Sequence, residues 1–243
     1  MNEYDDLEDE DIEYDPPTAE RVRRRAWALS CVIYRSFLEK YDDLSEAATG
    51  QSRILNWVDV IDLQDEFEPD EWGLIESDIG TITEQAIING TWRSEGLAVL
   101  AWALGAFELP PHDQMSHPKE ATDSIFFLAD DALAKADQLQ LRPSEELEKF
   151  CAVQLSLHWR LRDFSIRPEA MNFREFLETA WFGPIDLSGV PFEEDDLAIN
   201  GQPIAKAPPE EVQLCSSIAM ERHKAINWLN GWHEIYSEVD TST

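Results

Sequence analysis

The sequence is poor in positive charge. It has 19 Lys and Arg against 50 Asp and Glu, which gives a formal net charge of −31 and a pI of about 4.2. A surface of that sign repels phosphate backbones and anionic lipid head groups. We therefore expect no binding to nucleic acid or to membranes. A basic protein partner would be attracted over a long range.

Cysteine and long apolar runs are also scarce. Cys31, Cys151 and Cys215 are far apart, and no pair has zinc-ligand spacing, so we expect reduced core residues. The longest apolar run, Leu97 to Leu104, is too short to cross a membrane. The first residues lack the basic and apolar regions of a signal peptide. These features predict a cytoplasmic protein.

Familiar site motifs are missing as well. The sequence has no H-E-x-x-H, no G-x-S-x-G, no P-loop and no G-x-G-x-x-G. "FEEDD" at Phe192–Asp196 lacks the alternate-residue spacing of an EF-hand loop, and we expect a solvated loop there. His112 and His117 lie in a Pro-rich loop, five residues apart, which does not define a metal site. We expect no metal and no cofactor.

The sequence is rich in helical periodicity. Apolar residues recur every three or four positions along most of the chain after residue 17. From Gly96 to Leu104 every residue is apolar or Gly, which predicts a central buried helix, with Thr91 as its cap. Asn200-Gly201 is a strong hairpin-turn signal. We predict an all-α fold of seven to nine helices, a single domain over 18–243, with one small β-hairpin inserted at about 185–207.

Residues 1–17 form a separate acidic tail. Nine of the first fifteen residues are Asp or Glu, and none is Lys or Arg. In one interpretation the tail folds back on the arginines that begin the first helix, Arg21, Arg23, Arg24 and Arg25. In the other it binds a basic protein in trans. The partner-binding residues of the second interpretation are Asp5, Asp6, Glu8, Asp9, Glu10, Asp11 and Glu13.

A carboxylate interrupts the apolar stripe of the last helix. On a wheel of 100° per residue, Glu221 falls on the stripe, Arg222 at its edge and His223 on the opposite side. The apolar members of the stripe are Leu214, Ile218, Ala225, Trp228 and Trp232. A buried carboxylate needs a partner, and we expect Arg93 or Arg160. Leu100, Trp102, Ile218, Ala225 and Trp228 are expected in the core.

Other polar residues also lie on packing faces. Gln154 and His158 fall on the stripe of the helix that Ser144 is expected to cap, and Arg93 and Glu95 precede the central apolar run. In one interpretation they form a satisfied internal network that fixes helix register. In the other they line a cleft, with Glu221 as general base or metal ligand and His158 as acid or second ligand. The candidate catalytic residues are Glu221, His158, Arg93 and Glu95.

Several segments, taken in order, resemble the bacterial family catalogued as domain of unknown function 4272. They follow an Arg-rich first helix and are "WRSEGLAVLAWALG" (92–105), "LHWRLRD" (157–163), "DLAINGQPI" (196–204) and "ERHKAINWL" (221–229). The last segment, "YSEVDTST", has Tyr236 where the family has Trp, and the acidic head also differs from the usual family start. The resemblance implies a mostly helical protein and implies no activity.

Three functions stay open. The first is an acidic protein-binding module, in its sharpest form an immunity- or antitoxin-like protein that neutralises a basic partner. The second is an uncharacterised hydrolase or transferase with a site around Glu221, His158 and Arg93. The third is an accessory or regulatory protein. The missing catalytic motifs favour a protein that is not an enzyme.

Overall fold

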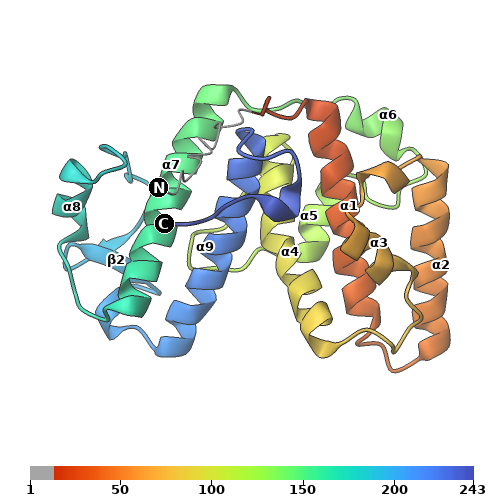
Figure 1. Cartoon of the computed structure of the whole chain (residues 1–243), viewed down its shortest axis with the longest axis horizontal. Helices are drawn as coiled ribbons and strands as arrows, with labels where there is room; N and C mark the ends of the chain where they lie inside the picture. Colours follow the sequence, from red (N-terminus) through yellow and green to blue (C-terminus); the bar gives the residue numbers. More distant parts are fainter. Residues whose placement is uncertain (1–13) are drawn as a thin grey trace, which may run out of the picture.

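The computed structural model describes residues 14–243. The acidic residues predicted to bind a partner, from Asp5 to Glu13, lie outside the described residues. The part from residue 14 onward is mostly helical, as predicted, and Figure 1 shows its arrangement. Its nine α-helices are α1 (Ala19–Leu38), α2 (Leu44–Val60), α3 (Pro69–Glu76), α4 (Glu84–Ala103), α5 (Pro118–Ser124), α6 (Ala132–Ala136), α7 (Ser144–Ile166), α8 (Phe173–Thr179) and α9 (Pro209–Leu229).

The remaining elements are short. Three 3₁₀ turns, η1 (Gln64–Glu66), η2 (Ile204–Lys206) and η3 (Tyr236–Glu238), join or follow the helices. Strands β1 (Phe192–Glu193), β2 (Asp196–Ile199) and β3 (Gln202–Pro203) form one antiparallel sheet in that order. Over residues 14–243, no helix combines the length and the apolar character that a membrane span requires.

The long helices pack in a row. Figure 1 shows α7, α9, α4 and α1 in succession, and α4 packs against both α1 and α9. Because it has neighbours on two sides, α4 is buried from Ser94 to Ala101, which confirms the predicted central helix. Apolar side chains form two clusters. One joins α1, α2, α4 and the C-terminal half of α9, and the other joins α7, α8, the sheet and the N-terminal half of α9.

The predicted hairpin turn is present. Asn200 and Gly201 connect β2 to β3 with φ of 49° and 74°, the left-handed values that a two-residue turn of this kind requires. The sheet has a third strand that was not predicted. The prediction of a solvated loop at Phe192–Asp196 holds only in part: Glu194 and Asp195 form an exposed turn, but the first two residues form β1, and Asp196 is buried in β2.

One predicted helix start and one predicted cap were wrong. The central helix begins at Glu84 and is capped by Thr83, so it runs through Thr91, whose hydroxyl donates to the Ile88 carbonyl. The α7 helix begins at Ser144, but Pro143 occupies the cap position, and the Ser144 side chain makes no capping bond. A capping-type residue inside a longer helix therefore misplaced the start of α4, whereas the start of α7 at Ser144 is as predicted.

Most expected core residues are buried, with exceptions. Leu100, Ile218, Ala225 and Trp228 are buried as predicted. Trp102 is only half-buried, with its ring against Phe150 and the Arg142 guanidinium. On the stripe of the last helix, Leu214 is also only half-buried, and Trp232 is 51% exposed because it follows the end of α9.

Gly90 of α4 packs directly against Ser36 of α1. A Cβ at this position would lie 2.0 Å from Ser36 Oγ and 3.1 Å from Ser36 Cβ. We predict that Gly90→Ala destabilises the protein by about 1–3 kcal/mol, because the two helices would have to separate. Urea unfolding measures this. The matched control is Gly73→Ala in α3, where a Cβ meets nothing within 4 Å and the better helix propensity should leave stability unchanged or up to about 1 kcal/mol higher. Equal loss in both variants would contradict the prediction.

Candidate functional site

The arginines at the start of α1 are bonded to the body of the protein. Arg21 Nε lies 2.9 Å from Glu66, and Arg24 donates to the Asp62 carbonyl at 2.6 Å. Arg25 is buried and paired with Glu71. Arg23 Nη2 lies 3.3 Å from Asp137. The unfavourable position of these cations at a helix N-terminus is therefore offset by acceptors on η1, α3 and the segments beside α2 and α6.

Glu221 pairs with Arg93, one of its two predicted partners. The Arg93 Nη1 to Glu221 Oε2 distance is 3.6 Å, and Glu221 is 7% exposed. The other predicted partner, Arg160, is instead bonded to Asp196 by two hydrogen bonds of 2.8 and 2.7 Å. Glu221 Oε2 makes no hydrogen bond within residues 14–243, so the pair is a loose one.

The C-terminal segment covers this pair. Tyr236 in η3 is buried, and the Arg25 and Arg93 guanidinium carbons lie 5.0 and 5.9 Å from its ring centre. A Cβ at Gly96 would lie 2.1 Å from Tyr236 Oη, so only glycine lets the ring sit on α4. Burial, aided by the charge of Glu221, raises the pKa of the Tyr236 hydroxyl. The arrangement keeps Glu221 away from solvent.

Glu95 belongs to a second, separate contact. Its oxygens accept from the Ser116 amide at 2.7 Å, the Ser116 hydroxyl at 3.0 Å and Arg222 Nε at 2.9 Å. Arg222 also donates to the carbonyls of Pro110, Pro111 and Gln114. Glu95 and Arg222 are therefore closed around the loop between α4 and α5, with no oxygen of the Glu95 carboxylate free for chemistry.

His158 faces another histidine. Its Nδ1 lies 3.1 Å from Nδ1 of His223, across the interface of α7 and α9. The prediction that His223 points away from the packing face was wrong, because α9 packs on α4 and α7 and so has two buried faces. Desolvation lowers the pKa of each imidazole to about 4, helped by Arg162 at His158 and by His158 at His223. At neutral pH the pair is uncharged, and one ring donates to the other.

The four candidate catalytic residues thus divide into three contacts. Arg93 and Glu221 meet each other, Glu95 meets Arg222, and His158 meets His223. A cleft of about 370 Å³ is lined by Gln154 and Arg222 with the loops at 109–112 and 186–190, and not by Glu221 or His158. Within residues 14–243, no three His, Cys, Asp or Glu side chains are placed to hold a metal ion. Cys31, Cys151 and Cys215 are buried free thiols.

Several hydrogen bonds anchor the sheet. Asp196 accepts from the buried Arg160 and from the Met171 amide. His112 Nε2 lies 2.9 Å from the Ala198 carbonyl, and Asp113 accepts from the Asn200 amide. His112 therefore holds a loop to β2 and is not grouped with His117, which lies on another cleft.

That cleft was not predicted. A groove of about 650 Å³ lies between α1, α2 and α5 and is lined by apolar and aromatic side chains together with Arg53. The turn at its wall has φ of 61° at Phe126 and 58° at Leu128, each costing about 1–3 kcal/mol for a residue that is not glycine. The adjacent aromatic residues of "SIFFLA" (124–129) fit the helical periodicity of the sequence, so the pattern gave no sign of the turn.

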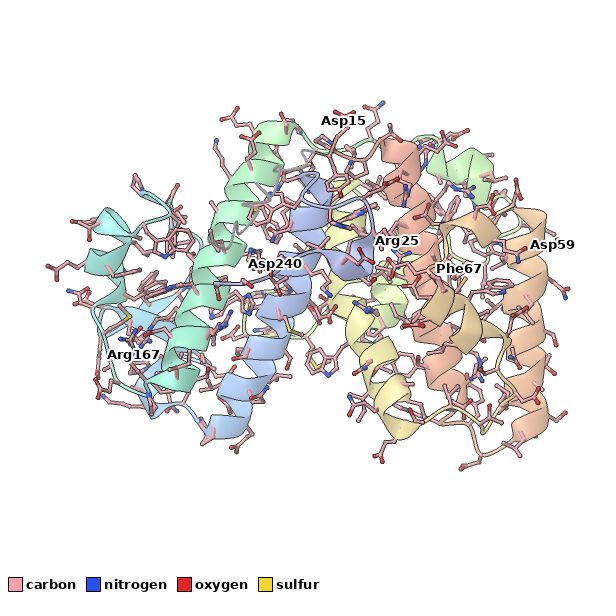
Figure 2. The ribbon with its side chains drawn as sticks, viewed as in Figure 1. Asp15, Arg25, Asp59, Phe67, Arg167 and Asp240 are labelled. Atoms are coloured by element: carbon pink, nitrogen blue, oxygen red, sulfur yellow. The ribbon has the colours of Figure 1, made fainter. Side chains whose placement is uncertain are left out.

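Figure 2 labels several of the charged side chains. Arg25 lies among the helices near the centre, whereas Asp15 and Asp59 lie at the periphery. The fold and these contacts define a class: a mostly helical protein with its interior arginines paired to carboxylates and a small antiparallel sheet.

The family profile of domain of unknown function 4272 matches residues 7–174, and the chain belongs to this family. The resemblance noted in the sequence is therefore confirmed at family level. The match ends before the sheet and α9, which carry two of the resembling segments. No curated protein and no solved structure matches the chain.

The histidine pair predicts a specific pH dependence. Both folded-state pKa values, about 4, lie below the unfolded value of about 6.5. The unfolded chain therefore takes up protons first, and stability should fall as pH drops from about 6.5 to about 4. We predict a flatter dependence in this window for His158→Gln/His223→Gln, measured by urea unfolding at a series of pH values.

The exposed His117 supplies the control for this prediction. His117→Gln should keep the wild-type slope, whereas the double variant should lose part of it. The pKa of His112 is also lowered by burial, but its contribution is common to all three proteins. The same slope in the wild type and the double variant would contradict the account.

Proposed function

We propose that the protein is an acidic protein-binding module that neutralises a basic partner protein, in the manner of an immunity protein or antitoxin, in the cytoplasm of a bacterium. The net charge of −31 supports this proposal. The buried core accounts for almost none of that charge, because its arginines and carboxylates nearly balance. The buried members are Arg25, Arg35, Arg160 and Arg222 on one side and Glu66, Glu71, Glu95, Asp196 and Glu221 on the other.

The pairing of the α1 arginines is the observation that carries the proposal. The competing interpretation needs the acidic tail to neutralise Arg21, Arg23, Arg24 and Arg25 within the same chain. Each of these already bonds to an acceptor in the fold. The tail carboxylates are therefore not needed there, which favours a basic partner in trans.

The positions of the candidate catalytic residues support a catalytic function less well than a binding function. An enzyme site would bring Glu221, His158 and Arg93 to one open cleft, with a group of matched pKa within reach of a substrate. Instead Glu221 is covered by η3, and His158 is a neutral partner of His223. These contacts fit a scaffold that fixes helix register.

Affinity capture from the native organism tests the proposal. The full chain is used as bait at low and at high salt, and captured proteins are identified by mass spectrometry. The proposal expects a basic protein recovered in stoichiometric amount at low salt and reduced at high salt, because screening weakens the attraction. A partner that is acidic, or capture that salt does not change, would overturn it.

The tail has its own prediction. Neutralising its seven predicted contact residues to Asn and Gln keeps the chain length but removes seven charges. They are Asp5, Asp6, Glu8, Asp9, Glu10, Asp11 and Glu13. We predict association with the captured partner at least about three-fold slower at low salt, and a smaller salt dependence, with an unchanged melting temperature. Stopped-flow mixing and thermal melts measure both.

A matched control variant distinguishes the effect of the tail carboxylates from the effect of total net charge. It neutralises seven exposed carboxylates whose side chains make no ion pair or hydrogen bond within residues 14–243. They are Asp59, Asp65, Glu76, Asp130, Glu148, Glu178 and Glu234. The tail variant should slow association more than this control. Equal slowing would show that only the total charge matters, and a lower melting temperature of the tail variant would support folding back in cis.

A further inference from the structure

The groove between α1, α2 and α5 has the size of a small-molecule site. Its volume of about 650 Å³ falls within the range typical of ligand pockets, about 300–1,000 Å³. Its walls are unusually aromatic, with Tyr34, Phe37 and Tyr41 from α1 and the residues after it, and Phe127 from the turn that follows α5. Such walls suit a flat ring, which gains from edge-to-face contact as well as from burial.

The turn that forms one wall is held in place. The turn contains Phe126 and Leu128, both of which have left-handed backbone conformations. Three side-chain donors grip its carbonyls: Trp27 bonds to Ile125 at 2.9 Å, Trp57 to Ala129 at 3.3 Å, and Arg53 to Leu128 at 3.3 Å. Strained backbone persists only where surrounding contacts over-determine it, and it gathers at ligand sites. These hydrogen bonds therefore fix the turn that forms the groove wall.

Arg53 gives the groove a guanidinium that is not paired with a carboxylate within the described chain. Ten of the thirteen arginines have a carboxylate within 4 Å, but Arg53 has none among residues 14–243. In a chain with 50 acidic residues this is an unusual position for a guanidinium. Its single hydrogen bond within the same range goes from Nη2 to Leu128, which leaves Nη1 and Nε for a planar acceptor.

We propose that this groove binds a small aromatic carboxylate, with the ring between Tyr34, Phe37 and Phe127 and the carboxylate on Arg53. The charge of Arg53 selects an anion, and the aromatic walls select the ring. Lys119 also lines the groove but is paired with Asp123, so Arg53 supplies the selective charge. This proposal does not rest on the proposed partner protein, because the residues that carry it belong to α1, α2 and α5 and the segments beside them.

Isothermal titration calorimetry of the full chain tests the assignment with four probes. The first three, 2-naphthoate, 2-naphthalenemethanol and 2-naphthylmethylamine, share a ring system and differ in charge, and decanoate keeps the carboxylate without the ring. We expect 2-naphthoate to bind at least about ten-fold more tightly than the neutral alcohol, as a charged hydrogen bond allows, and more tightly than decanoate. The amine should bind most weakly.

Variants locate the binding. Arg53→Gln should weaken 2-naphthoate binding about ten-fold or more, and Arg53→Lys should restore part of it. The control is Arg162→Gln on α7, another exposed arginine without a carboxylate within 4 Å in the described chain, and it should not change the affinity. Thermal melts of all variants show whether each is folded.

Several results would overturn the proposal. One is no saturable binding of 2-naphthoate. Others are equal binding of the alcohol, or an unchanged affinity in a folded Arg53→Gln variant. Tighter binding of decanoate than of 2-naphthoate would overturn the choice of an aromatic ligand.

Discussion

Two ion pairs join α4 to α9, and much of the molecule is arranged around them. Glu95 and Arg222 are buried together, and Arg93 and Glu221 pair beside them, two residues away on α4 and one residue away on α9. A buried charge that lacks its partner is very costly, so each of these residues admits few arrangements of the two helices. Arg222 then fixes the loop after α4 through three carbonyls, and that loop fixes the sheet through His112. The two ion pairs thus set the register of α4 against α9, the helix that contributes to both apolar clusters.

The same constraint explains the division between interior and surface. Arginines that would otherwise offset the acidic surface are committed to the core, as Arg25, Arg35, Arg160 and Arg222 show. These arginines also donate hydrogen bonds to backbone carbonyls: Arg35 donates to the Ser77 carbonyl, and Arg160 donates to the Glu169 carbonyl. A guanidinium suits this role because its planar donors can serve a carboxylate and carbonyls at once. The protein consequently presents a strongly anionic exterior on a core of nearly zero net charge.

Much of the fold followed from sequence pattern, and the failures have physical causes. Helical period and the Asn200-Gly201 turn predicted the fold class, and the cost of a buried carboxylate predicted an arginine for Glu221. A single apolar stripe could not place His223, since α9 packs on two helices. The helical-wheel projection misplaced Trp232, because α9 ends at Leu229, before this residue. The groove was not predicted because Phe126 and Leu128 adopt left-handed backbone conformations although neither is glycine. The local sequence contains no residue type that predicts such a turn.

A double-mutant cycle on Glu95 and Arg222 tests the central claim most directly. The free energy of unfolding is measured in urea for the wild type, Glu95→Ala, Arg222→Ala and the double variant. If the pair organises the interface, the two losses should be far from additive, with a coupling energy of about 2–3 kcal/mol. Losses that add to within about 0.5 kcal/mol would show that the two residues act independently, and would contradict the account.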